Sequence, residues 1–184
     1  MSASLSRSIR KTVAILGGGL SLTPEVVDKV LRSSAFVIAI NNAWLLAPDA
    51  DVLFACDVKW WMANPEAFSF RGEKFVCQDN PRLAHVTYLT PQPIGAGSNS
   101  ALQAAYWAAD QGAHRIVLFG IDLRPEELTH WHGQHKDLKN PTVNTFARAR
   151  RAWEKFSPKC EVVNCSLRSA LECFPKMTIE EALA

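Results

Sequence analysis

The sequence lacks the features that would assign it to several specialised classes of protein. It has no apolar run long enough to be a transmembrane segment, so we expect no membrane partner. A net charge of only +2 over 184 residues disfavours nucleic acid as a partner. The apolar run that follows the basic N-terminal residues spans only 13–16, and no small-residue cleavage site follows it, which argues against a signal peptide. We therefore expect a cytoplasmic globular protein.

The five cysteines include no Cys-x-x-Cys pair. An odd number of cysteines without such a pair predicts free thiols in a reducing compartment. Cys56, Cys77 and Cys165 fall within or at the ends of apolar runs, where a small buried core residue is the expected role. Nothing in their spacing predicts a structural zinc site.

The length of the chain predicts a single domain. Residues 1–11 are rich in Ser, Arg and Lys and are expected to form a flexible arm, which leaves 12–184 for the domain. No internal repeat, low-complexity tract or linker interrupts this range.

Short apolar segments alternate with longer amphipathic ones. Strands are expected at 13–16, 36–40, 52–56, 74–77, 85–89, 115–119 and 161–164, and helices at 24–31, 59–62, 101–111, 143–156 and from 178 onward. The helix over 143–156 is expected to bury one face, formed by Val143, Phe146, Ala149 and Trp153. Continuous apolar strands separated by helices predict a mostly parallel sheet with helices on both faces. The expected fold is a Rossmann-like, doubly wound α/β domain.

Small or short polar residues follow the central strands at the points where these strands end. They are Gly17, Gly18 and Gly19 with Ser21, Asn41 and Asn42, Asp57, Gly120 and Asp122, and Asn164 and Ser166. Parallel strands place such residues along one edge of the sheet, where folds of this class bind ligands. We therefore expect a binding crevice at this edge.

Two glycine-containing loops lead into helices. In the first, Leu22 stands where the dinucleotide-binding fingerprint has its third glycine, and no acidic residue ends the second strand, so NAD is disfavoured. This loop still suits an anion at a helix N-terminus, the alternative being a tight turn without a ligand. The second loop, which contains Gly97, Ser98, Asn99 and Ser100, could contact a nucleotide together with the first, or could supply helix caps.

Three of the five histidines, His130, His132 and His135, lie within six residues and follow Asp122. One of them could act as a general base with a pKa near neutrality. The cluster could instead bind a metal together with Asp122, although its spacing is not a strong metal signature. The third alternative is structural, with the histidines bonded to loop backbone.

The order of the motifs resembles a known superfamily. The sequences GGGLSL, INN, FACD, GSNS, VLFGIDL and HWHG, spread over about 13–171, are similar to those of the bacterial sialyltransferases and the DUF115 or MptE-like proteins, especially short members from phages and prophages. The resemblance implies a nucleotide or nucleotide-sugar ligand, CMP-like or ATP-like, and glycosyl or phosphoryl transfer.

The resemblance implies a role for individual residues in each of the matching motifs. Gly17, Gly19, Ser21 and Leu22 match the first loop of the sialyltransferases, whereas Gly18 and Leu20 replace its Asn and Pro. The family's second-strand asparagine falls on Asn41 or Asn42, its nucleotide-gripping Ser-Gly loop falls loosely on 97–100, and its catalytic base falls on His130 or His132. The MptE-like branch implies magnesium, with Asp57 and Asp122 as the candidate carboxylates. Only about twenty residues separate Asp122 from the next helix, fewer than in the lid of the sialyltransferases.

The sequence thus predicts a nucleotide-binding transferase with Asp122 and His130 or His132 as catalytic candidates. A homo-oligomer is compatible with the sequence but is not indicated by it. Two alternatives stay open: a non-catalytic phage accessory protein that binds a nucleotide or a host component, and a metal-dependent hydrolase that uses the histidine cluster.

Overall fold

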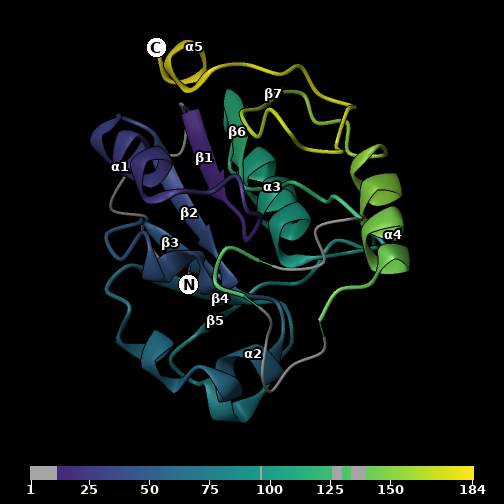
Figure 1. Ribbon diagram of the computed structural model, residues 1–184. Helices are drawn as coiled ribbons and strands as arrows, with labels where there is room; N and C mark the ends of the chain where they lie inside the picture. The colour runs from purple at the N-terminus through teal and green to yellow at the C-terminus, as the bar shows by residue number, and fades with distance from the viewer. Residues whose placement is uncertain (1–11, 96, 126–129, 134–139) are drawn as a thin grey trace.

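A parallel sheet forms the centre of the protein (Figure 1). The computed structural model describes residues 12–95, 97–125, 130–133 and 140–184, so the expected arm at 1–11 lies outside the described residues. The described strands are β1 (Thr12–Leu16), β2 (Phe36–Ile40), β3 (Val52–Phe54), β4 (Glu73–Val76), β5 (Thr87–Tyr88), β6 (Arg115–Phe119) and β7 (Glu161–Asn164). All six neighbouring pairs are parallel, in the order β5-β4-β3-β2-β1-β6-β7. The predicted Rossmann-like α/β fold is confirmed.

In the described residues, α-helices and short 3-10 helices connect or follow these strands. They are α1 (Pro24–Arg32), α2 (Val58–Ala63), α3 (Ser100–Asp110), α4 (Val143–Trp153) and α5 (Ile179–Leu183), with short 3-10 helices η1 (Asn41–Leu45), η2 (Pro65–Ser69) and η3 (Pro81–Leu83). Thr23 and Asn99 cap α1 and α3 through their side chains, and Thr178 and Glu181 form the predicted capping box of α5. None of the described helices is long and apolar enough to cross a membrane.

The strand order changes direction beside β1. Strands β2 to β5 follow one another on one side of β1, whereas β6 and β7 lie on its other side. The chain connections that leave the carboxyl ends of β1 and β6 therefore run in opposite directions. The crevice between them is where doubly wound folds bind ligands.

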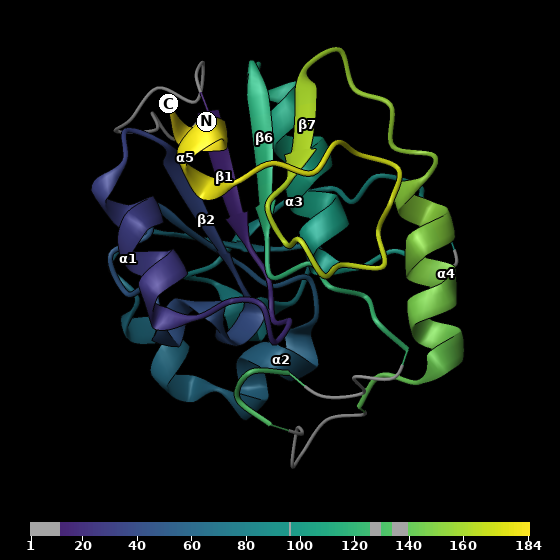
Figure 2. The same cartoon turned by 45° about the horizontal axis from the view of Figure 1, so that its top comes forward.

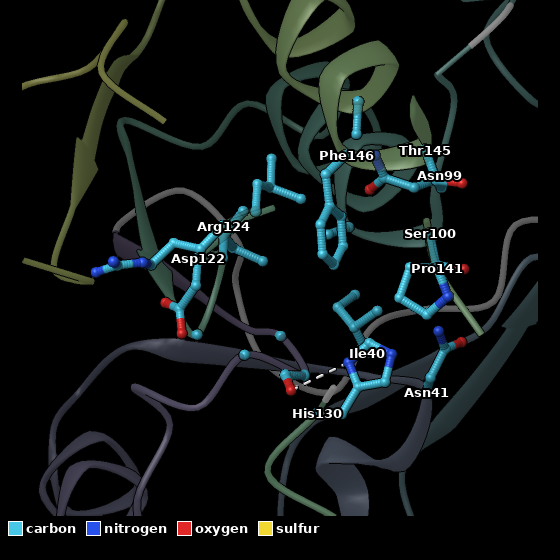
Figure 3. Close-up of a pocket in the computed structure, with 18 of the residues that line it drawn as sticks. Ile40, Asn41, Asn99, Ser100, Asp122, Arg124, His130, Pro141, Thr145 and Phe146 are labelled. Atoms are coloured by element: carbon cyan, nitrogen blue, oxygen red, sulfur yellow. Dashed lines mark hydrogen bonds between the residues drawn. The ribbon is translucent and has the colours of Figure 1, made fainter. Parts of the chain in front are cut away.

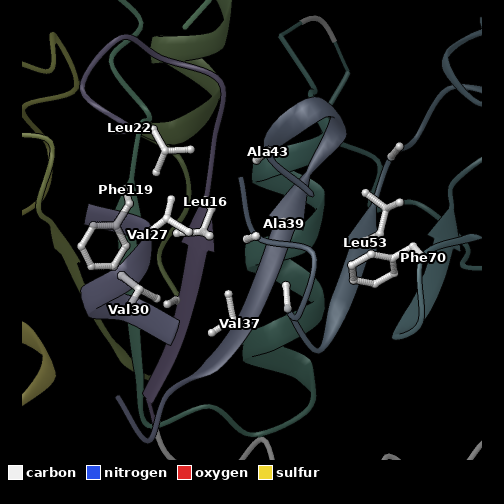
Figure 4. Close-up of a cluster of buried hydrophobic side chains, with 14 of the residues drawn as sticks. Leu16, Leu22, Val27, Val30, Val37, Ala39, Ala43, Leu53, Phe70 and Phe119 are labelled. Carbon is white, nitrogen blue, oxygen red and sulfur yellow. The ribbon is translucent and has the colours of Figure 1, made fainter. Parts of the chain in front are cut away.

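Two apolar layers enclose the sheet because successive residues of each strand face opposite sides. Val13 and Ile15 of β1 belong to the layer that contains α3 and Trp153 of α4. Ala14 and Leu16 belong to the layer that contains Val27 and Val30 of α1. Figure 2 shows α1 and α3 on different sides of the sheet, and Figure 4 shows Leu16 beside Val27 and Val30.

Helix α4 differs from its expected burial. Ala149, Ala152 and Trp153 are buried, but Val143 is 51% exposed and Phe146 is only partly buried. The first turn of α4, which includes Phe146, therefore does not contribute to the core layer.

Candidate functional site

A pocket of about 220 Å³ lies at the carboxyl ends of β1, β2 and β6, where the strand order changes direction (Figure 3). We call it the switch-point pocket. It is lined by residues 17–20, Ile40, Asn41, residues 99–101, residues 120–124, His130, Pro141, Thr145, Phe146 and Ala149. The crevice expected from the strand ends is therefore present in the structure.

The first glycine loop is shaped by its close approach to the end of β6. A Cβ atom on Gly17 would lie 2.5 Å from the carbonyl oxygen of Gly120, and one on Gly19 would lie 2.5 Å from Asp122 Oδ2. The amide of Gly17 donates to Phe119 O at 2.7 Å, and that of Gly19 donates to Gly120 O at 2.8 Å. These two amides are used within the protein, so Gly17 and Gly19 serve close packing against the end of β6.

Asp122 fastens this loop to the end of β6. Its side chain accepts hydrogen bonds from the amide of Ser21, at 2.8 Å, and from the Ser21 hydroxyl. Asp122 is only 5% exposed, and its own carbonyl accepts the amide of Ala170 at 2.8 Å. The predicted site residues Ser21 and Asp122 therefore act together to hold one wall of the pocket.

The two asparagines after β2 have different environments. Asn41 lines the pocket and has a φ of 48°, a left-handed conformation that asparagine tolerates better than most residues. Asn42 points elsewhere, because its Oδ1 accepts a hydrogen bond of 2.8 Å from Trp60 Nε1. Asn41 is therefore the asparagine of the pocket.

The second glycine loop contributes only its last residues to the pocket. Asn99 and Ser100 line it at the start of α3, and the Ser100 hydroxyl accepts the amide of Cys56 at 3.0 Å. Ser98 is exposed and bonds Gln103 Nε2 at 2.9 Å. Gly97 has a φ of 102° and lies against the backbone of Arg148 in α4. Neither Ser98 nor Gly97 lines the pocket.

Asp57 lies apart from the switch-point pocket. It is exposed at the start of α2, where its carbonyl accepts the amides of Trp60 and Trp61. It does not line the pocket that contains Asp122, so the two carboxylates implied as magnesium ligands are not brought together there. Within the described ranges, no group of three or more His, Cys, Asp or Glu side chains is arranged to hold a metal ion.

Of the three clustered histidines, His130 lines the pocket. Its Nδ1 lies 3.2 Å from the carbonyl oxygen of Gly18, which also accepts the amide of Trp131 at 3.1 Å. His132 does not line the pocket but stacks on His130, with ring centroids 5.1 Å apart. His135 lies outside the described residues.

The hydrogen bond to Gly18 indicates which nitrogen of His130 carries the proton. A carbonyl oxygen only accepts, so Nδ1 must be the donor in this contact. In the neutral ring the basic lone pair then belongs to Nε2. The bond therefore fixes both the orientation and the tautomer of the imidazole.

Several pocket residues were not expected from the sequence. They include Ile40, Leu123, Pro141, Thr145 and Phe146. Figure 3 shows Phe146 extending from α4 into the pocket, with His130 on the opposite side. No signal in the sequence indicated Phe146, because its helical spacing with Ala149 and Trp153 predicts the buried face of the helix.

The chain was also compared with known proteins. No family model matches it, and neither the curated proteins nor the solved structures gave a match. The resemblance to the sialyltransferase and DUF115 proteins therefore rests on the motifs alone, and the functional assignment rests on the site.

Proposed function

We propose that the switch-point pocket binds a nucleotide and that the protein transfers a glycosyl or phosphoryl group from it. The observation that carries this proposal is the composition of the pocket: an aromatic and aliphatic wall faces the N-terminus of α3 and an oriented histidine. A nucleotide needs the same combination, since its base is flat and largely apolar and its phosphates are anionic.

The base would lie between Phe146 and His130. These two rings extend into the pocket from opposite sides (Figure 3). Aromatic rings favour offset stacking and edge-to-face contacts, and both arrangements suit a flat heterocycle between them. Asn41 lines the same pocket and has an amide that could both donate to and accept from the edge of a base.

The phosphates would lie at the start of α3. The amides of Ser100 and Ala101 belong to the first turn of this helix, where backbone donors have no acceptor within the helix. The positive end of the helix dipole adds to the attraction of an anion. Because the amides of Gly17 and Gly19 are already used, α3 replaces the first glycine loop as the proposed phosphate-binding element.

His130 would act as the general base. Its Nδ1 is oriented by Gly18, so Nε2 is the atom that would take a proton from an acceptor hydroxyl. Asp122 would act as a positioning residue, because it holds the loop that carries Gly18 through its contacts with Ser21. The proposed general base is therefore His130 and not His132.

Binding is tested by thermal shift and calorimetry with CMP, CDP, ADP and ATP as separate probes. We expect at least one nucleotide to raise the melting temperature of the wild-type protein, and Phe146→Ala to reduce its affinity about tenfold or more through loss of the stacking surface. Val143→Ala is the matched control, since Val143 is in the same helical turn but is exposed and does not line the pocket. No shift with any of the four nucleotides would overturn the proposal.

A non-catalytic nucleotide-binding protein is the second candidate. It is favoured by the contacts of His130 with Gly18 and His132, which could equally serve to close the loop over a ligand. Chromatographic analysis of the nucleotide after prolonged incubation, with and without sugar or alcohol acceptors, separates the two candidates. Binding without any turnover would favour the non-catalytic protein.

A further inference from the structure

Two cysteines face each other just beyond the ends of β3 and β4. Phe54 and Phe75 are partners in the register of these strands, and Cys56 and Cys77 each follow two residues later on the same face. The amide of Cys77 donates to the carbonyl of Cys56 at 3.2 Å, so the pairing continues past the ends of the strands. The two Sγ atoms lie 2.6 Å apart.

We propose that Cys56 and Cys77 form a reversible intramolecular disulfide and that this pair is an oxidative modification site of the protein. Neighbouring strands lie about 4.7–4.9 Å apart, which is within the Cα separation of about 4.4–6.8 Å that a disulfide bridges. The sulfur atoms already lie close to the bonded distance of about 2.05 Å. The strands therefore need not separate for the bond to form.

The other three cysteines have no such arrangement. Cys160, Cys165 and Cys173 are free thiols at separate positions, and Cys165 Sγ is 3.6 Å from the carbonyl of Thr178. Burial raises the pKa of each of these thiols, that of Cys165 to about 12, and the hydrogen bond with Cys77 together with burial raises the pKa of Cys56 as well, so position rather than acidity distinguishes the pair. Among the five cysteines, the Cys56–Cys77 pair is thus the one whose geometry favours an intramolecular bond.

The oxidation balances with a small disulfide such as oxidised glutathione as the electron acceptor. One cysteine thiolate attacks the small disulfide and releases one glutathione thiolate, and the second cysteine then displaces the other glutathione from the mixed disulfide. The protein loses two protons and two electrons, and two molecules of reduced glutathione are formed. Cys77 lines a cavity of about 80 Å³ together with Leu89 and Thr90.

The pair is also connected to the switch-point pocket. The amide of Cys56 donates to the hydroxyl of Ser100, which is the first residue of α3 and lines the pocket. Any backbone shift at Cys56 that accompanies oxidation would therefore act on the helix start where the phosphates are proposed to bind. This coupling rests on the proposed function, whereas formation of the disulfide does not.

The disulfide is tested on the reduced full-length protein in glutathione buffers of increasing oxidised fraction, followed by alkylation of remaining thiols and peptide mass spectrometry. We expect a linked Cys56–Cys77 peptide lacking two hydrogen atoms, which dithiothreitol converts back to two alkylated peptides. Cys173→Ser is the matched control, since it removes an exposed thiol and should leave the linkage unchanged. Linkage between other cysteines, or mixed glutathione disulfides alone, would overturn the proposal.

The same titration in concentrated urea shows whether the fold favours the bond. We expect the native protein to form the linked peptide at a lower oxidised fraction than the unfolded chain, because β3 and β4 hold the two thiols together. Equal formation in both states would overturn the proposal. If the disulfide forms but no nucleotide binds to either redox form, the proposed function fails while this inference stands.

Discussion

Asp122 accepts hydrogen bonds from both the amide and the hydroxyl of Ser21, a residue 101 positions earlier in the chain. These bonds join the loop after β1 to the loop after β6 at the point where the strand order changes direction. Gly19 lies directly against the same carboxylate. Close contacts between these two loops therefore form one wall of the pocket.

Substitution of Asp122 tests this contact. Asp122→Asn keeps the shape but removes the charge, and its amide has one oxygen to accept from two donors of Ser21. We expect the free energy of unfolding in urea to fall by about 1.5–3 kcal/mol, the usual range for hydrogen bonds to a charged group. Ser21→Ala is the smaller change and should lower the free energy of unfolding by about 1 kcal/mol, because the hydrogen bond from the backbone amide of residue 21 to Asp122 remains. Wild-type stability for Asp122→Asn would contradict the assigned role.

Gly19→Ala is expected to introduce a steric clash. Its Cβ would lie 2.5 Å from Asp122 and 2.8 Å from the carbonyl oxygen of Gly120. Overpacking of this kind costs about 1–3 kcal/mol, measured by urea unfolding. In an Asp122→Ala background part of this cost should disappear, since one of the clashing groups is gone.

Gly95→Ala is the control for that double-mutant cycle. Gly95 has a φ of 74°, and no atom lies within 4 Å of the place that a Cβ would take, so its substitution strains the backbone without a clash. The loss of stability should be the same in the wild-type protein and in the Asp122→Ala background, because the two sites share no contact. If the effects of Gly19→Ala and Asp122→Ala were also additive, the Asp122 carboxylate would not be the reason that position 19 needs a glycine.

The central strands could be predicted because they are continuous apolar segments, and most of the helices because side chains cap their first turns. Phe36–Ile40 is buried throughout, and Thr178 and Glu181 lie at the spacing of a capping box. These signals are local in sequence. The end of β2 was less predictable, since two identical residues follow Ile40 and only the positive φ of Asn41 and the bond of Asn42 to Trp60 distinguish them.

The pocket was only partly predictable because its walls are formed by contacts distant in sequence. Glycines at 17 and 19 indicate that something approaches closely, but the sequence does not say that Gly120 and Asp122 do so. Phe146 has helical spacing with Ala149 and Trp153, which predicts the core. It lines the pocket instead, because the first turn of α4 lies beyond the layer in which Trp153 is buried.

The ion pair between Lys29 and Glu180 should make the stability of the protein sensitive to acid. Their atoms Nζ and Oε1 lie 2.6 Å apart and join α1 to α5. The hydrogen bond and the charge of Lys29 hold the pKa of Glu180 below its ordinary value of 4.5. A depressed folded-state pKa means that the stabilisation is present above about pH 4.5 and is lost as the pH falls through the folded value.

Glu180→Gln should therefore lower the melting temperature slightly near pH 7 and make no difference at the acid end of the range. Melting curves between pH 3 and pH 7 measure this, and added salt should reduce the difference because both side chains are exposed. Asp28→Asn, which removes the partner of Arg32 within α1, controls for loss of a surface charge that does not join two helices. A constant difference across the whole pH range would contradict the linkage.

His130 and His132 should differ in their effects on transfer. His130→Asn removes the proposed base, and general-base catalysis contributes about 10²–10⁴-fold to a rate, so we expect kcat to fall within that range. Nucleotide-induced thermal shifts should also decrease, because one of the two stacking rings is lost, but binding should remain detectable because Phe146 and the start of α3 are unchanged. His132→Asn should keep most of the activity, since His132 stacks on His130 but does not line the pocket.

The pH profile distinguishes a base from a residue that only supports the loop. A general base must be unprotonated to act, so wild-type kcat should rise with pH, and His132→Asn should retain this rise. His130→Asn should lose it, leaving residual activity that does not follow an imidazole. Equal losses in both variants with unchanged pH profiles would mean that the histidines act by closing the loop, and the non-catalytic interpretation of the Gly18 contact would then be preferred.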